Sequence, residues 1–337
     1  MRVCIIGTSN AIYRDGYAAG VRDHRHVTCF EKHALGASPS VIVPYLANKI
    51  DFSRFDWVVF ETTINDQNYL KYGSIRKEQI REFIEWGIAR ASSQGCRTAL
   101  MVMPTIPGLK GGTIPRLIYR KIAEESGALL FDGFAHLGDC DASSFIDRFH
   151  VKKPIARRLG QLLAERLYAA RRSYLPIVSP RSHFYCRPAI VAEGARLVSR
   201  STSMVTAEFA VLDGGASIHV DAGPWDELAG VAYNAACSSA TLSFGGDPSV
   251  TKSLRTKYAF ADRELLMLVA PVTGRPRAGK TYGGFPVRLV AKETQPDEAS
   301  RFDHIPDSVD DLPYKAEVGE FIFRRRLRYA GAILSNA

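Results

Sequence analysis

Short apolar runs alternate with helical patterns over about the first 175 residues, and this alternation constrains the fold more than any other feature of the chain. The runs with the composition of strands are Arg2–Gly7, Val27–Glu31, Trp57–Glu61, Thr98–Met103 and Ala128–Asp132. Strand, helix and strand in strict succession form βαβ units, which give a parallel sheet with helices on both faces. The sequence therefore predicts an α/β domain over residues 1–174.

The helices between these runs have recognisable ends. Ser38-Pro39 is typical of an N-cap followed by proline in the first turn, and predicts a helix that continues towards Ile50. A longer helix is predicted from Ser74, because apolar residues then recur at helical spacing until Gly95 stops the pattern. A further helix is predicted over about residues 151–172.

The pattern changes between Tyr174 and Pro180, where Leu-Pro and Ser-Pro dipeptides indicate a linker. Beyond it, over residues 181–337, small and β-branched residues alternate, and glycine pairs supply turns. The expected strands are Ser203–Leu212, Ala216–Val220, Ala240–Phe244, Leu265–Val269 and Pro286–Ala291. This half is predicted to be a β-rich accessory or substrate-shaping domain, for which a sandwich is one arrangement.

Composition and charge exclude several classes of protein. A content of 46% hydrophobic and 23% charged residues excludes a disordered, collagen-like or coiled-coil chain. No apolar run approaches the ~18 residues that span a bilayer, and the first run is too short for a signal peptide, so we expect a cytoplasmic protein. The net charge of +9 fits an anionic partner such as a polyanionic glycan, a nucleotide or a membrane surface. Nucleic acid is not expected as a partner, because no nucleic-acid-binding motif occurs.

The six cysteines are widely spread and include no C-x-x-C pair, which argues against a disulfide framework and against a cysteine-based zinc site. Cys4 and Cys29 lie in apolar runs and are expected to be buried thiols. His136, Asp139, Cys140 and Asp141 match no standard metal-site spacing. We expect neither a metal nor a cofactor.

Polar segments follow the predicted strands, where the ligands of parallel α/β sheets bind. They are Gly7-Thr8-Ser9-Asn10, Leu35-Gly36-Ala37-Ser38, Thr62-Thr63-Ile64-Asn65-Asp66 and Asp147-Arg148-Phe149-His150. In this order, the four segments resemble the blocks of the SGNH (GDSL-like) hydrolase family over about residues 1–172. The resemblance implies a flavodoxin-like three-layer α/β/α fold and acyl-ester chemistry.

Carried over by motif, the resemblance makes Ser9 the nucleophile, Gly36 the second-block glycine and Asn65 the asparagine of the third block. Asp147 and His150 match the closing D-x-x-H. There are two departures from the family pattern: Gly-Thr-Ser stands in place of Gly-Asp-Ser, and Thr-Ile-Asn-Asp in place of G-x-N-D.

The chemistry of these side chains agrees with the resemblance. A serine hydroxyl needs an adjacent base to act as a nucleophile, and the imidazole of His150 can accept its proton. Asp147, three residues earlier, can fold back to orient the ring and offset the imidazolium charge. The backbone N–H groups of Ser9 and Gly36 and the side-chain amide of Asn65 are candidate oxyanion donors.

Each member of this set also has a purely structural interpretation. Ser9 can cap the following helix, Asn65-Asp66 can form a turn or cap, and Gly36 can serve a turn before Ser-Pro. Asp147 and His150 can be an ordinary helix-entry pair. A second D-x-x-H, Asp23-His24-Arg25-His26, precedes the second strand, where the family pattern does not place the base.

Two further segments have alternative interpretations. Gly274–Thr281 satisfies the P-loop expression, but Tyr-Gly-Gly-Phe-Pro follows it, so we interpret it as a chance match in a basic hairpin. Phe321–Tyr329 mixes aromatic and basic residues and is predicted to be an edge strand or a terminal helix.

These observations favour a serine-dependent esterase or acetylesterase that forms an acyl-Ser9 intermediate. The expected substrate is an acylated small molecule or a glycan, and a glycan or glycan precursor is favoured because family members with an added β-domain often act on glycans. An O-acyltransferase on the same residues, or a glycan- or partner-binding protein without activity, remains an alternative.

Overall fold

Five parallel strands and the helices that connect them form the first half of the computed structural model, which describes residues 1–138, 141–173, 175–202, 206–260, 263–279, 283–299 and 312–327. The strand order is β2-β1-β3-β4-β5, as in flavodoxin-like sheets. The strands are β1 (Arg2–Gly7), β2 (Cys29–Ala34), β3 (Trp57–Phe60), β4 (Arg97–Val102) and β5 (Leu129–Asp132). The central strands are buried on both faces, which explains their nearly continuous apolar runs.

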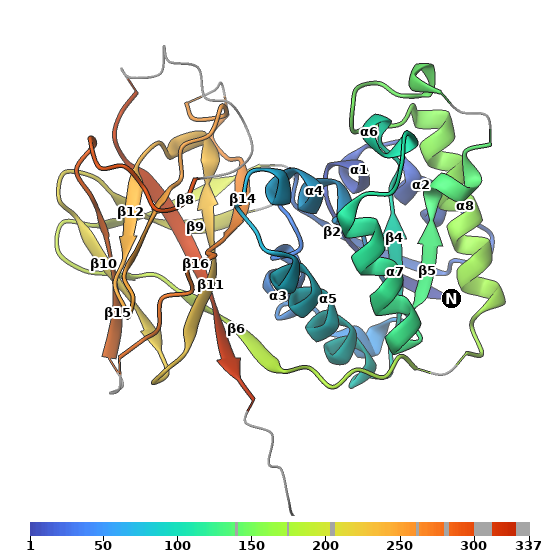
Figure 1. Ribbon diagram of the computed structural model, residues 1–337, viewed down its shortest axis with the longest axis horizontal. Helices are drawn as coiled ribbons and strands as arrows, with labels where there is room; N and C mark the ends of the chain where they lie inside the picture. Colours follow the sequence, from blue (N-terminus) through green and yellow to red (C-terminus); the bar gives the residue numbers. More distant parts are fainter. Residues whose placement is uncertain are drawn as a thin grey trace, which may run out of the picture.

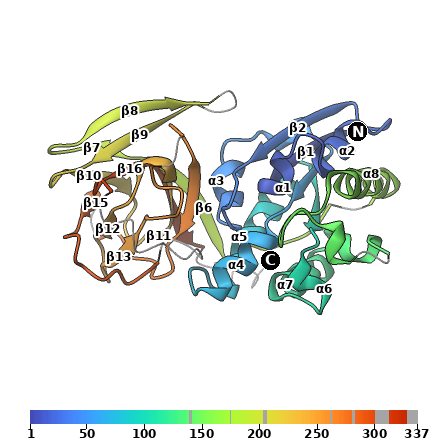
Figure 2. The same cartoon turned by 90° about the horizontal axis from the view of Figure 1, so that it is seen from above.

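Helices cover both faces of this sheet (Figure 1). They are α1 (Ser9–Ile12), α2 (Tyr17–Arg22), α3 (Ile42–Ala47), α4 (Thr63–Lys71), α5 (Lys77–Ser92), α6 (Ile106–Leu109), α7 (Ile114–Ser126) and α8 (Lys153–Ala169). Alternate residues of β1 divide between the two layers: Val3 and Ile5 pack with α2 and α8, whereas Cys4 and Ile6 pack with α3, α5 and α7. Seen from above, α8 and α5 lie on opposite sides of the sheet (Figure 2).

The predicted α/β elements are present, with shifted ends. The second strand was expected over Val27–Glu31, but β2 begins at Cys29 and ends at Ala34. The helix expected from Ser38 to Ile50 is shorter in the structure, where α3 has six residues. The predicted cap at Ser38 is wrong, because its hydroxyl instead accepts a hydrogen bond from the backbone N–H of Val269. Cys4 is buried as expected, but Cys29 is exposed because β2 lies at the edge of the sheet.

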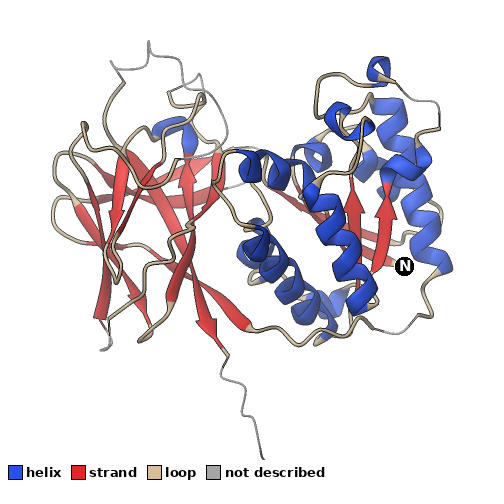
Figure 3. Cartoon of the chain, viewed as in Figure 1, coloured by secondary structure: helices blue, strands red, loops and turns tan. Residues whose placement is uncertain are grey.

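The second half contains two antiparallel sheets, whose strands contrast with the helix-rich first half in Figure 3. One sheet has the order β13-β12-β15-β10-β7, and the other has the order β14-β11-β16-β9-β8 with β6 also paired to β16. The strands are β6 (Ser182–Pro188), β7 (Ile190–Val191), β8 (Arg196–Ser201), β9 (Thr206–Leu212), β10 (Ser217–Ala222), β11 (Glu227–Asn234), β12 (Thr241–Phe244), β13 (Val250–Ser253), β14 (Met267–Pro271), β15 (Gly283–Leu289) and β16 (Ala316–Arg326). Side chains of both sheets share one apolar core, which makes this half a β-sandwich.

The described part of the segment Phe321–Tyr329, residues 321–327, forms neither an edge strand nor a helix. Its first residues belong to β16, which pairs with β11 on one side and with β9 and β6 on the other. The apolar residues Phe321, Ile322 and Phe323 are fully buried, so the segment is central to its sheet. Arg328 and Tyr329 lie outside the described residues, as do residues 203–205 of the predicted strand Ser203–Leu212.

The two halves meet through an apolar interface. The core cluster on the α3–α5–α7 side of the parallel sheet also contains Phe184, Ala229, Val269 and Ile322 from the sandwich. The last helix of the α/β half ends at Ala169 and β6 begins at Ser182, and the chain between them passes below α5 and α7 in Figure 1. A shared apolar core holds the two halves in one arrangement.

None of the helices within the described ranges has the length and apolarity needed to cross a membrane.

Candidate active site

Ser9 lies at the carboxyl end of β1, where α1 begins. Its Oγ is 2.8 Å from Nε2 of His150, although the two residues are 141 positions apart in the sequence. The cap residue of α1 is Thr8, which makes no side-chain cap hydrogen bond. The alternative interpretation of Ser9 as a helix cap is therefore wrong.

Asp147 and His150 occupy a tight loop before α8. Asp147 Oδ1 accepts the backbone N–H groups of Phe149 and His150 at 2.7 and 3.0 Å, and both carboxylate oxygens lie 2.8–2.9 Å from His150 Nδ1. The loop is closed by a hydrogen bond from the Ile146 N–H to the His150 carbonyl. Since the carboxylate accepts the Nδ1 proton, Nε2 presents its lone pair to the hydroxyl of Ser9.

Electrostatics favour the ionised form of Asp147. Burial by itself raises the pKa of this carboxyl, but hydrogen bonds from the Phe149 N–H and from His150 outweigh it, so the pKa is lowered from its usual value. The ring of Tyr13 packs edge-on against the His150 imidazole, with ring centroids 5.1 Å apart. The imidazole is thus fixed by Asp147 on one nitrogen and by Tyr13 on its ring.

The candidate oxyanion donors occupy neighbouring segments. Among the described residues, the N–H of Gly36 donates to no protein acceptor, and the N–H of Ser9 begins a helix and has no intrahelical acceptor. Asn65 Nδ2 donates to the Ser38 carbonyl at 3.0 Å, which leaves its second amide hydrogen available. A side chain at Gly36 would meet only Ile12 within 4 Å. The protein itself therefore leaves space at this position.

Two buried carboxyls, Glu61 and Asp66, support the site, and Glu61 was not among the predicted site residues. Glu61 follows β3 and accepts both the N–H and the hydroxyl of Thr8, each at 3.1 Å. Asp66 accepts the Ser40 N–H at 2.7 Å and the Thr62 hydroxyl at 2.8 Å. An acidic residue directly after a buried strand was the signal that could have indicated Glu61.

The environments of these carboxyls differ from that of Asp147. Burial raises the pKa of Glu61 to about 8, although the hydrogen bonds from Thr8 oppose the shift. Burial also raises the pKa of Asp66, to about 7, against hydrogen bonds from Ser40 and Thr62. The departure from Gly-Asp-Ser has a physical reason here, since an aspartate at position 8 would face the buried Glu61 carboxyl, whereas Thr8 donates to it.

Two glycines allow the helices that follow the site segments to touch. A Cβ at Gly20 in α2 would lie 2.0 Å from the Arg157 carbonyl oxygen, and a Cβ at Gly160 in α8 would lie 1.9 Å from that of Tyr17. Close backbone contact thus connects the helix that follows Ser9 with the helix that follows His150.

The second D-x-x-H lies away from this site. Asp23 forms ion pairs with Arg22 and Arg157, and His26 stacks on Tyr168 with centroids 3.7 Å apart. These residues precede β2 and therefore lie near the amino-terminal ends of the parallel strands, whereas Ser9 lies at the carboxyl ends.

Two arginines of the P-loop-like segment form ion pairs with glutamates elsewhere in the chain. Arg275 binds Glu82 at 2.7 Å and Arg277 binds Glu227 at 3.2 Å. Lys280 and Thr281 lie outside the described residues, and strand β15 begins at Gly283, whereas a P-loop would open a helix there.

Of the residues considered as metal ligands, the structure describes His136 and Asp141. His136 stacks on Phe131, and Asp141 caps a short 3-10 turn. Asp139 and Cys140 lie outside the described residues. Within the ranges that the structure describes, no group of three or more His, Cys, Asp and Glu side chains could hold a metal ion.

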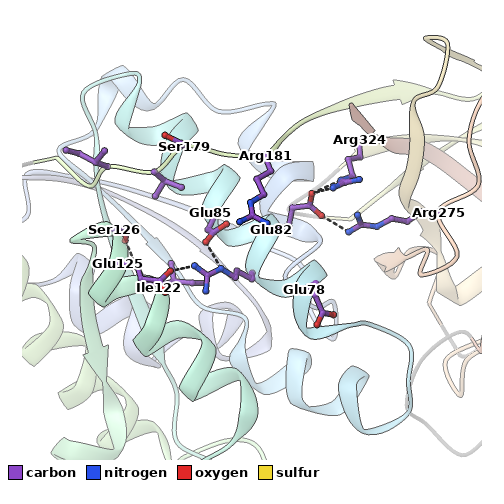
Figure 4. A pocket seen from close by; sticks show the side chains of 13 residues that line it. Glu78, Glu82, Glu85, Ile122, Glu125, Ser126, Ser179, Arg181, Arg275 and Arg324 are labelled. Atoms are coloured by element: carbon purple, nitrogen blue, oxygen red, sulfur yellow. Dashed lines mark hydrogen bonds and ion pairs between the residues drawn. The ribbon is translucent and has the colours of Figure 1, made fainter. Parts of the chain in front are cut away.

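A cavity of about 740 Å³ lies between the domains, and none of the candidate site residues lines it. Its walls come from α5, α7, the segment before β6, β16 and the loop before β15 (Figure 4). Glu82 binds Arg275 and Arg324 across it, and Arg81 binds Glu85 and Glu125. The lining charges thus pair largely with one another.

No family model matches the chain, and no curated protein matches it in sequence. Among solved structures, it is similar to a two-domain esterase (CEX) active on acetylated mannans, with a TM-score of 0.63 and 13% identity over 98% of this chain and 92% of that chain. The same values hold for that esterase co-crystallised with mannopentaose.

Other solved structures align with one half of the chain. A protein assigned to the G-D-S-L lipolytic family, from Desulfitobacterium hafniense, covers 49% of this chain and 98% of its own, with 14% identity and a TM-score of 0.41. The likeness to CEX spans both halves and agrees with the predicted fold class. The chain therefore shares its fold with the two-domain esterase CEX, an α/β/α domain followed by a β-rich domain.

Proposed function

We propose that the protein is a serine-dependent carboxylic ester hydrolase that removes acyl groups from a glycan or glycan precursor. The observation that carries the proposal is the continuous chain of hydrogen bonds from Ser9 Oγ through His150 to Asp147. The fold shared with CEX supports it, since CEX is an esterase active on acetylated mannans.

In the proposed reaction, Ser9 Oγ attacks the ester carbonyl carbon while His150 Nε2 takes the hydroxyl proton. The carbonyl electrons move to oxygen, where the N–H groups of Ser9 and Gly36 and the amide of Asn65 would donate. The intermediate collapses, and the leaving alcohol takes the proton from His150. Water then attacks the acyl-Ser9 carbonyl with His150 again as the base, which releases the carboxylic acid and restores the serine.

The first test is hydrolysis of p-nitrophenyl acetate by the full chain, Ser9→Ala and His150→Ala, with folding checked by circular dichroism. We expect both folded variants to lose at least about 10³-fold in kcat. Turnover that persists in folded Ser9→Ala would exclude the acyl-serine mechanism.

The second test concerns the substrate. Release of acetate from acetylated mannan should exceed release from an equally acetylated simple alcohol, because a glycan substrate would add contacts beyond the ester. Equal kcat/KM values for both would contradict a glycan substrate. Donor turnover that rises on addition of a free sugar acceptor would identify transfer instead of hydrolysis.

A further inference from the structure

We infer that the β-sandwich domain positions the loop that carries Gly36, and that Ser38 is the positioning residue through which it acts. The inference rests on the proposed function, in which Gly36 donates to the oxyanion. Residues 36–41, called here the Gly36 loop, connect β2 with α3 and lie where the two domains meet.

On its α/β side, the Gly36 loop is held by the first turn of α4. Asn65 Nδ2 donates to the Ser38 carbonyl at 3.0 Å, and the Ser40 N–H donates to Asp66 at 2.7 Å. These two bonds leave the Ser38 hydroxyl free to point towards the other domain.

On its other side, the Gly36 loop closes the edge of a sandwich sheet. β14 is an edge strand, so the N–H groups on its outer side need partners. The Val269 N–H donates to the fully buried Ser38 Oγ at 3.0 Å, and Gln79 Nε2 donates to the Val272 carbonyl at 3.2 Å. The Ser38 hydroxyl also has a long contact of 3.5 Å with the Gly36 carbonyl. One hydroxyl therefore connects the loop backbone to β14.

Apolar contacts reinforce this connection at both ends of the loop. Ala37 packs against the sandwich core, and its φ of +57° is unusual for a residue other than glycine. Val41 is fully buried, and a Cβ at Gly230 of β11 would lie 2.7 Å from its Cγ2. A glycine in the sandwich thus makes room for Val41, and contacts with the sandwich hold the loop in a conformation that most residues avoid.

The domains are also fixed relative to each other away from the loop. Glu82 of α5 binds Arg275 and Arg324 of the sandwich (Figure 4). The Glu82 carboxylate also accepts the Ser182 hydroxyl. This cluster provides a matched control, because Ser182 is buried at the same interface but contacts no residue of the Gly36 loop.

The experiment compares Ser38→Ala with Ser182→Ala, and Gly230→Ala with Gly245→Ala, all in the full chain. A Cβ at Gly245 would lie 2.3 Å from Pro286, so it crowds the sandwich without approaching the Gly36 loop. The measurements are kcat and KM on p-nitrophenyl acetate, and amide hydrogen exchange of a peptide that covers residues 36–41.

We expect Ser38→Ala and Gly230→Ala to lower kcat by about 10- to 100-fold with KM nearly unchanged, because a displaced donor acts mainly in the transition state. Exchange in the loop should accelerate in both. Ser182→Ala and Gly245→Ala should keep the kcat and the loop exchange of the wild type.

Wild-type kcat and loop exchange in folded Ser38→Ala would overturn the inference while the proposed function stands. A kcat equally reduced in Ser182→Ala would also overturn it, since any loss at the interface would then suffice. If the wild type hydrolyses no ester, the proposed function fails, and unchanged loop exchange in Ser38→Ala would separately refute the anchoring.

Discussion

Ser9 Oγ and His150 Nε2 are within hydrogen-bond distance, although Ser9 lies near the start of the α/β domain's sequence and His150 lies near its end. The helices that follow them in the chain, α2 and α8, touch through Gly20 and Gly160. Because these helices pack backbone against backbone, a small change in their separation would be transmitted to both ends of the Ser9–His150 contact.

Gly160→Ala should destabilise the protein by about 1–3 kcal/mol and lower ester turnover, because the new Cβ would lie 1.9 Å from the Tyr17 carbonyl oxygen. Urea denaturation and kcat on p-nitrophenyl acetate measure the two effects. Gly111→Ala is the control, since a Cβ there has no neighbour within 4 Å. Equal midpoints for wild type and Gly160→Ala would contradict the close crossing.

Asp147→Asn should lower kcat by about 10²- to 10⁴-fold, since a neutral amide neither fixes the Nδ1–H tautomer nor offsets the imidazolium charge. Steady-state kinetics should show a much smaller change in KM. A kcat within a few-fold of wild type would show that the 2.8 Å contact with Nδ1 has no role in turnover.

Tyr13→Ala should lower kcat by about 2- to 10-fold, because the imidazole loses its edge-on ring contact. Tyr13→Phe keeps the ring and should retain the wild-type kcat. A loss in Tyr13→Phe as large as that in Tyr13→Ala would instead assign the effect to the phenolic hydroxyl.

Glu61→Gln should change how stability depends on pH. The native pKa of about 8 lies above the ordinary value of 4.5, so the native state binds more protons than the unfolded state between these limits. The stabilising contribution is therefore complete below about pH 4.5 and declines as pH rises towards 8.

Urea titrations at pH 5 and pH 8.5 test this expectation. The decrease in unfolding free energy between the two should be smaller in Glu61→Gln than in wild type by at least about 1 kcal/mol. A parallel pH dependence in both proteins would show that Glu61 titrates normally.

Glu82→Gln should destabilise the domain interface by about 3 kcal/mol or more, because the Arg275 and Arg324 guanidinium groups lose their shared carboxylate. Thermal unfolding and urea denaturation measure the loss. Glu78→Gln is the control, since Glu78 lines the same cavity but forms no ion pair with a described residue. Equal losses in the two variants would contradict the proposed contribution of the cluster.

The parallel sheet could be predicted because its central strands are buried on both faces, so their apolar runs are continuous and end in polar segments. The central position of β16 could not be predicted, because its buried aromatic residues run directly into an arginine cluster. The segment was therefore predicted to be an edge strand or a terminal helix. Two of those arginines, Arg324 and Arg325, form ion pairs with Glu227 and Asp226, and sequence pattern cannot reveal such partners.

The site, like the fold, could be predicted only in part from the sequence. The residues that motif matching selected include Ser9, His150 and Asp147, which hydrogen bonds connect. Their supports could not be found in this way: Ser38 has the sequence context of a helix cap, and its partner Val269 is 231 positions away. Its role depends on how two domains pack, which no local pattern encodes.

The position of β16 has a consequence for biosynthesis. This strand lies between β11 on one side and β9 and β6 on the other, yet it occupies residues 316–326. On the ribosome, the α/β half can emerge and fold while its neighbour still lacks this strand. Until residue 326 has left the exit tunnel, the nascent chain exposes unpaired strand edges. Premature termination in this region should therefore produce aggregation-prone products.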